Sequence, residues 1–197
     1  MAAWAGLAVE HRLLFLPGGG PFADTVRAAD DRFDLSDNTA HWMAILAMDQ
    51  FAYLLSDLTP NAVPVHDLST AAAVSAGGKL AILAPSALLL QEDPLPHSWQ
   101  VTSDSLAAWL AQYANAPLLV LLKSLVGVPQ LDERGGSNGL QRSTSAQQLT
   151  HFDIVDPYFG QALSPPTRCW LIDGRQPDRL AELLRCGTTI GTEIVAG

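Results

Sequence analysis

Arg12-Leu13-Leu14-Phe15-Leu16-Pro17-Gly18-Gly19-Gly20-Pro21-Phe22 joins a short apolar run to three glycines and then to a helical pattern. Glycines at such a junction let the backbone approach a ligand closely and present free N–H groups at a helix start, which suits an anion. A tight turn is the alternative interpretation of the same three residues. The spacing matches neither GxGxxG nor GxxxxGK[ST], so it predicts neither a standard dinucleotide fold nor a Walker P-loop.

Short apolar runs and helical patterns alternate along the rest of the chain, which predicts an α/β fold. The runs are apolar throughout and bounded by Gly, Pro or charged residues, as expected of buried parallel strands. The predicted strands are residues 12–17, 80–84, 118–122 and 169–172, and the predicted helices are residues 22–30, 39–55, 102–114 and 177–185.

Composition narrows the class of protein. The 197 residues are 48% hydrophobic and 16% charged, which predicts one compact domain and excludes general disorder. A formal charge of −9 repels phosphate backbones and anionic membranes, so we expect neither a nucleic acid nor a membrane partner. Lys79 and Lys123 are the only lysines.

Cysteine usage and the chain start indicate the compartment. Cys169 and Cys186 are isolated and lack a CxxC or Cys/His pattern, so neither a disulfide framework nor a zinc site is predicted. The N-terminus lacks a signal-peptide pattern, and no apolar run approaches the ~20 residues of a membrane span. We therefore expect a soluble, cytoplasmic protein.

A second polar segment, residues 96–105, leads into the predicted helix and places several hydroxyls and Asp104 at its start. Ligands of open α/β sheets bind at such strand-to-helix connections, although simple helix capping by Thr102 or Ser103 explains the same residues. The five histidines show no metal-site spacing, and Ser98 beside His97 lacks a GxSxG elbow. We predict no protein-bound metal and no hydrolase chemistry. The polar residues 132–148 predict a mobile loop.

Several of these segments, in this order, resemble the amino acid kinase superfamily, which includes acetylglutamate, aspartate and uridylate kinases. The glycine run, the Thr102-Ser103-Asp104-Ser105 helix start and residues 116–122 with Gly127-Val128 carry the resemblance. Segments 17–24, 40–49, 97–99 and 173–179 look most like the aminomethylfuran phosphate kinase branch, whose enzyme serves methanofuran biosynthesis.

The resemblance implies a three-layer αβα sandwich with a mostly parallel central sheet. It also implies ATP and Mg²⁺, a phosphorylated small-molecule acceptor bound by the half at about residues 1–95, and nucleotide bound by the half at about residues 96–197. Homo-oligomers or a partner subunit are further expectations. By motif match, the acceptor or its phosphate is bound by Gly18, Gly19 and Gly20, the nucleotide by Thr102, Ser103, Lys123 and Gly127, and Asp104 is catalytic.

Two departures from the family pattern leave alternatives open. Relatives begin with a strand ending in Lys-x-Gly-Gly-Ser, whereas this chain begins in the following helix, so we expect it to lack that strand and glycine loop. Relatives also read Thr-Asp-Val-Asp-Gly where residues 123–127 read Lys-Ser-Leu-Val-Gly. The chain is then an active kinase, a non-catalytic ligand-binding or partner subunit, or a sequence whose true start lies upstream.

Overall fold

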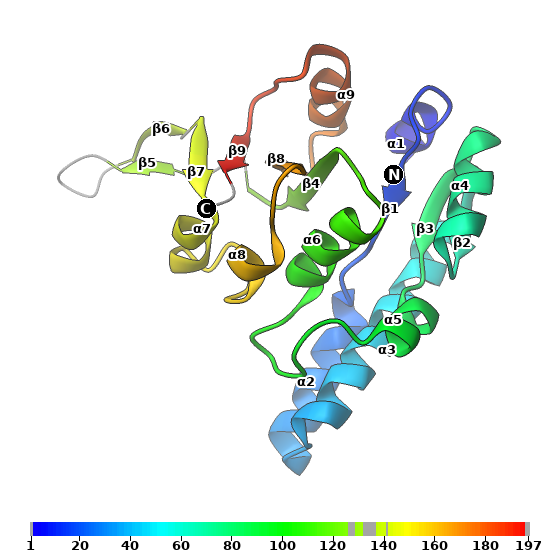
Figure 1. Ribbon diagram of the computed structural model, residues 1–197, viewed down its shortest axis with the longest axis vertical. Coiled ribbons are helices and arrows are strands. Elements are labelled where there is room, and N and C mark those ends of the chain that lie inside the picture. Colours follow the sequence, from blue (N-terminus) through cyan, green and yellow to red (C-terminus); the bar gives the residue numbers. More distant parts are fainter. Residues whose placement is uncertain (1, 126–128, 132–136, 141, 196–197) are drawn as a thin grey trace. The chain divides into compact units, whose positions relative to one another are not determined.

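The computed structural model describes residues 2–125, 129–131, 137–140 and 142–195 (Figure 1). The chain divides into two compact units, Met1–Ser103 and Asp104–Gly197. Parallel strand pairs occur in both units, in a mixed α/β architecture. The α/β fold class predicted from the alternating pattern is therefore confirmed.

The first unit contains a three-stranded parallel sheet in the order β1-β3-β2. All four residues of β3 are fully buried. Leu80 and Ile82 pack with Ala52 of α3, and Ala81 and Leu83 point to the opposite face because strand residues alternate. Both faces of the sheet are thus covered. The elements are α1 (Ala2–Leu7), β1 (Leu14–Phe15), α2 (Gly20–Phe33), α3 (Asp37–Asp57), β2 (Ala62–Val65), α4 (Leu68–Ala76), β3 (Leu80–Leu83) and α5 (Ser86–Glu92).

The second unit contains a four-stranded sheet in the order β4-β8-β9-β7, in which only β8 and β9 pair antiparallel. Helix α6 (Ser103–Tyr113) leads into it from the last residue of the first unit. The remaining elements are β4 (Leu118–Lys123), β5 (Pro129–Leu131), β6 (Ser137–Leu140), β7 (Ser143–Ser145), α7 (Ala146–His151), α8 (Phe159–Ala162), β8 (Arg168–Asp173), α9 (Pro177–Cys186) and β9 (Thr192–Val195).

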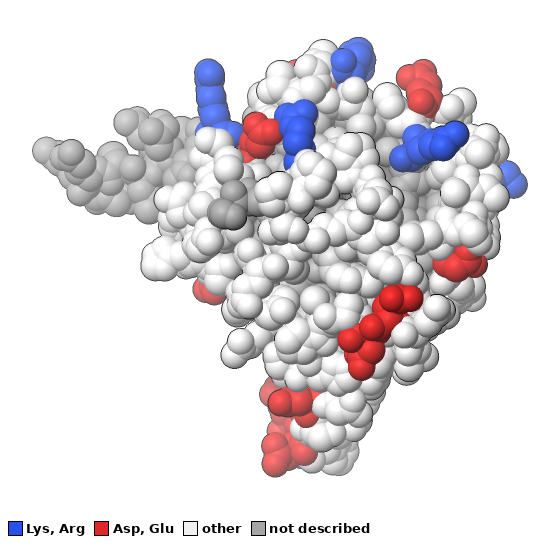
Figure 2. Space-filling view, in the orientation of Figure 1, with Lys and Arg blue, Asp and Glu red and all other residues white. Residues whose placement is uncertain are grey.

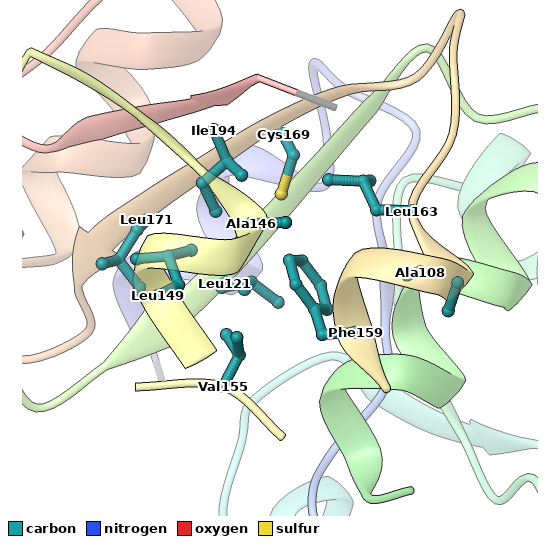
Figure 3. Packing of buried hydrophobic residues seen from close by; sticks show 11 residues of the cluster. Ala108, Leu121, Ala146, Leu149, Val155, Phe159, Leu163, Cys169, Leu171 and Ile194 are labelled. Atoms are coloured by element: carbon teal, nitrogen blue, oxygen red, sulfur yellow. The ribbon is translucent and has the colours of Figure 1, made fainter. Parts of the chain in front are cut away.

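Phe159 of α8 lies at the centre of the core of the second unit (Figure 3). Around it pack Leu149 of α7, Leu121 of β4 and Leu171 of β8. Cys169 of β8 belongs to the same core and is inaccessible to solvent, whereas Cys186 at the end of α9 is exposed. Both thiols are free, as the sequence predicts. Burying a large side chain such as Phe159 stabilises the unit by about 1.5–3 kcal/mol.

The prediction of a mobile loop at residues 132–148 is wrong for part of this segment. Residues 132–136 and 141 lie outside the described residues, but β6, β7 and the start of α7 fall within this segment. Ser143, Thr144 and Ser145 pair with β9 at the edge of the sheet. Ser145 then caps α7 by accepting a hydrogen bond from Gln148 N at 3.3 Å. The polar residues therefore serve an edge strand and a cap, two roles that composition alone does not distinguish from a loop.

Charged side chains are spread thinly over the face of the protein shown in Figure 2, in keeping with the low charged content. Across the part of the chain that the structure describes, we find no helix with the length and apolar character needed to cross a bilayer.

Candidate active site

Lys123 and Asp104 form an ion pair in the second unit. Lys123 is the last residue of β4, and its Nζ donates to Oδ2 of Asp104, in the first turn of α6, at 2.7 Å. The lysine side chain is 27% exposed and that of the aspartate only 12%, so one member is reachable by a ligand and the other is largely sheltered. The structure thus joins two residues that were predicted for the catalytic and nucleotide sites.

Burial raises the pKa of Asp104 above its ordinary value, and the nearby ammonium of Lys123 opposes that rise. Desolvation is the larger of the two effects, so the carboxylate is held in its charged form at a cost. A buried carboxyl with a perturbed pKa and one specific cationic partner is typical of a functional site.

Asp156 holds the start of α6 in place. Its Oδ2 accepts from Ser105 N at 3.0 Å, and its Oδ1 accepts from the Ser105 hydroxyl and from Tyr158 N. Asp156 is 7% exposed. Because Ser105 directly follows Asp104, these bonds fix the turn that carries the catalytic candidate. Sequence reasoning missed Asp156, since an isolated acid in a loop carries no local signal.

The backbone of Lys123 is fixed by the turn after β8. Asp173 pairs in register with Lys123, and Gly174 N donates to Lys123 O at 2.8 Å. The Asp173 side chain accepts from Arg175 Nε at 2.8 Å and from Arg175 Nη2 at 2.9 Å, and these bonds lower its pKa. Asp173 is therefore engaged by its own turn, and Lys123 Nζ pairs with Asp104.

The predicted glycine site lies in the first unit, where Gly19 is the N-cap of α2 and Gly20 is its first residue. A Cβ on Gly18 would lie 3.1 Å from Ser103 Oγ. The backbone at Gly18 therefore passes close to Ser103, one of the predicted nucleotide-binding residues. A Cβ on Gly19 would lie 2.4 Å from that of Ala23. The strand-glycine-helix junction predicted from the sequence is confirmed, and its role in binding stays a prediction.

Replacing Gly20 by alanine is expected to lower the free energy of unfolding by about 2–4 kcal/mol. The residue has φ +52°, and a Cβ would meet the Phe51 ring at 2.8 Å. Gly78→Ala is the matched control. Gly78 also has a positive φ, +70°, but a Cβ there would have its nearest neighbour, the Cα of Val9, 3.8 Å away. Urea unfolding of both variants measures the difference. Equal losses would contradict the steric role of Phe51.

The other predicted nucleotide residues are only partly described. Thr102 precedes α6, and Ser103 is its first residue. Gly127 lies outside the described residues. Around Asp104, the described His, Cys, Asp and Glu side chains form no group of three that could hold a metal ion. The few carboxylates near Asp104 suit Mg²⁺ only when phosphate oxygens supply most of its ligands, which is how Mg²⁺ binds in many kinases.

Comparisons with known proteins show which family and which folds the chain resembles. The model of the amino acid kinase family matches residues 2–150. A relative, the [5-(aminomethyl)furan-3-yl]methyl phosphate kinase of Methanocaldococcus jannaschii, is 26% identical over 187 residues, covering 94% of this chain and 85% of the relative. Uridylate kinase from Archaeoglobus fulgidus is similar in structure, with a TM-score of 0.71 at 18% identity and coverage of 98% and 90% of the two chains. Isopentenyl phosphate kinase from T. acidophilum gives a TM-score of 0.57 at 15% identity, with coverage of 98% and 87%.

Proposed function

The chain belongs to the amino acid kinase family, and we propose that it transfers the γ-phosphoryl group of ATP to a small phosphomonoester, an aminomethylfuran phosphate. The observation that carries the proposal is the Lys123–Asp104 pair, a partly exposed cation held by a buried carboxylate. The furan acceptor is supported by the relative from Methanocaldococcus jannaschii.

In the proposed reaction, a phosphate oxygen of the acceptor attacks the γ-phosphorus. A new P–O bond forms, the bond between the γ-phosphorus and the β,γ-bridging oxygen breaks, and ADP leaves with its electron pair. Such transfers need positioning and cancellation of negative charge more than covalent chemistry. Lys123 supplies a positive charge for the phosphoryl oxygens, and Asp104 orients its ammonium group.

Gly18, Gly19 and Gly20 would bind the acceptor phosphate through backbone N–H groups, and Thr102, Ser103 and Gly127 would border the nucleotide. Mg²⁺ would neutralise phosphate charge when bound with ATP. The carboxylates of Asp104 and Asp173 are engaged by Lys123 and Arg175, which leaves the phosphates as the main ligands. Assembly into homo-oligomers and a cytoplasmic location remain predictions.

The test is incubation of the purified protein with ATP, Mg²⁺ and aminomethylfuran phosphate, followed by mass spectrometry of the products. We expect ADP and the furan diphosphate in equal amounts. UMP and isopentenyl phosphate serve as comparison acceptors, because the two structural neighbours are kinases named for uridylate and isopentenyl phosphate. Turnover of one of these alone would refute the furan acceptor. Binding of ATP without transfer to any acceptor would favour the non-catalytic alternative.

A further inference from the structure

In the first unit, one histidine meets a carboxylate and a second histidine that lie more than 50 positions further along the chain and four positions from each other. His41 lies in the second turn of α3, Asp93 caps the C-terminus of α5, and His97 follows in the connection to α6. One ligand atom from each lies within 4.8 Å of the other two. The His41 and His97 rings stack with centroids 4.1 Å apart, and Trp42 packs edge-on against both.

We propose that His41, Asp93 and His97 bind a divalent transition-metal ion of the zinc type. Imidazole nitrogens with one carboxylate oxygen are ligands that Zn²⁺ and Co²⁺ accept, in contrast to the oxygen ligands that Mg²⁺ prefers. Three protein ligands leave a fourth position for water or another ligand. The proposal does not depend on the kinase reaction, since Asp104 and Lys123 take no part in this cluster.

The three candidate ligand atoms are nearly as close together as they would be around a bound ion. Tetrahedral zinc with bonds of about 2.1 Å places its ligand atoms about 3.4 Å apart. His97 Nε2 and Asp93 Oδ1 are 2.7 Å apart and form a hydrogen bond. A metal ion would replace the proton of that bond, and the pair would separate by less than 1 Å. The other pairs lie within 4.8 Å and would close by at most about 1.5 Å, and the stacked rings of His41 and His97 would tilt apart so that both nitrogens face one ion.

Asn38 supports this arrangement from one turn before His41. Its Oδ1 accepts a hydrogen bond from Nδ1 of His97 at 2.9 Å, which directs Nε2 toward Asp93. Metal-binding histidines are typically oriented by such a bond from the second ring nitrogen. Asp93 and His97 belong to the connection between α5 and α6, whereas His41 belongs to α3, so a bound ion would tie that connection to the start of α3.

The test is a metal titration of the full chain after removal of metal with a chelator. We expect one equivalent of Co²⁺ to bind and to develop visible ligand-field absorption, and Zn²⁺ to displace it. At a Zn²⁺ concentration 100 times the Kd, Tm should rise by about 5–10 °C. Both readouts are independent of phosphoryl transfer.

Matched variants locate the ion. His41→Ala and His97→Ala should weaken binding at least 100-fold, and Asn38→Ala, which removes only the orienting bond, should weaken it about 10–100-fold. His151→Ala is the control, because His151 is exposed at the end of α7 in the other unit, and it should bind as the wild type does. If circular dichroism shows that a histidine variant is unfolded, Asp93→Asn is used in its place to remove a ligand. Absence of saturable binding to the wild type, or equal binding by the cluster variants, would overturn the proposal.

Discussion

Lys123→Met is expected to lower kcat for phosphoryl transfer by about 10²–10³-fold, the loss seen when one preorganised charge-stabilising donor is removed. Methionine keeps much of the length of the lysine side chain but has no charge. Because Lys123 Nζ is the cation beside Asp104, the transferring group would lose its compensating charge while the strand remains intact. Steady-state measurement of ADP release gives kcat and KM separately.

The chain offers its own control, since Lys79 is its only other lysine and is exposed in the first unit. Lys79→Met should retain wild-type kcat. Lys123→Arg restores the charge with a planar group of different shape, so it should recover only part of the activity. Unchanged kcat in Lys123→Met, with a folded protein, would contradict the assigned role.

Asp104→Asn should combine two opposite effects. Phosphoryl transfer should fall by about 10²-fold or more, because Lys123 loses the carboxylate that positions its ammonium and small misplacements are costly. The folded state should nevertheless become more stable at neutral pH. Burial raises the pKa of Asp104 despite the attraction of Lys123, so keeping the carboxyl charged costs folding free energy that a neutral amide avoids.

The pH dependence of stability gives the sign of this effect. A carboxyl whose pKa is raised on folding favours the folded state below its unfolded pKa of 3.8, and the advantage is lost as the pH rises through the folded value. The gain in stability of Asp104→Asn over the wild type should therefore be small in acid and grow toward neutral pH. Urea unfolding at several pH values measures it. A variant less stable than the wild type at neutral pH would show that the ion pair outweighs desolvation.

The sequence predicted the parts of the fold that have a strong local pattern. The apolar runs identified β3, β4 and β8, and the glycine run identified the start of α2. Strands β7 and β9 were missed because their residues are mixed or polar, and α4 because its small side chains give no amphipathic stripe. These elements are specified by pairing and packing partners that are distant in the sequence.

In the candidate site, too, the sequence predicted single residues but not the contacts between residues that are distant in the chain. Asp104 and Lys123 were named separately from family motifs, but their ion pair spans 19 positions and depends on how α6 packs beside β4. Asp156 acts on Ser105 from 51 positions away. The ligands His41 and Asp93 are 52 positions apart, so a search for local metal-binding spacing could not find them.

Burial of Cys169 also determines how the protein reacts with its surroundings. Its pKa is raised first by desolvation and then by the neighbouring charge of Asp104, so the thiol is neither accessible nor ionised in the folded chain. Alkylating reagents react with thiolates that they can reach, and in the native protein that leaves Cys186. The wild-type chain therefore carries a single natural attachment point for a fluorophore, at the end of α9, and a second reactive thiol would report that the core had opened.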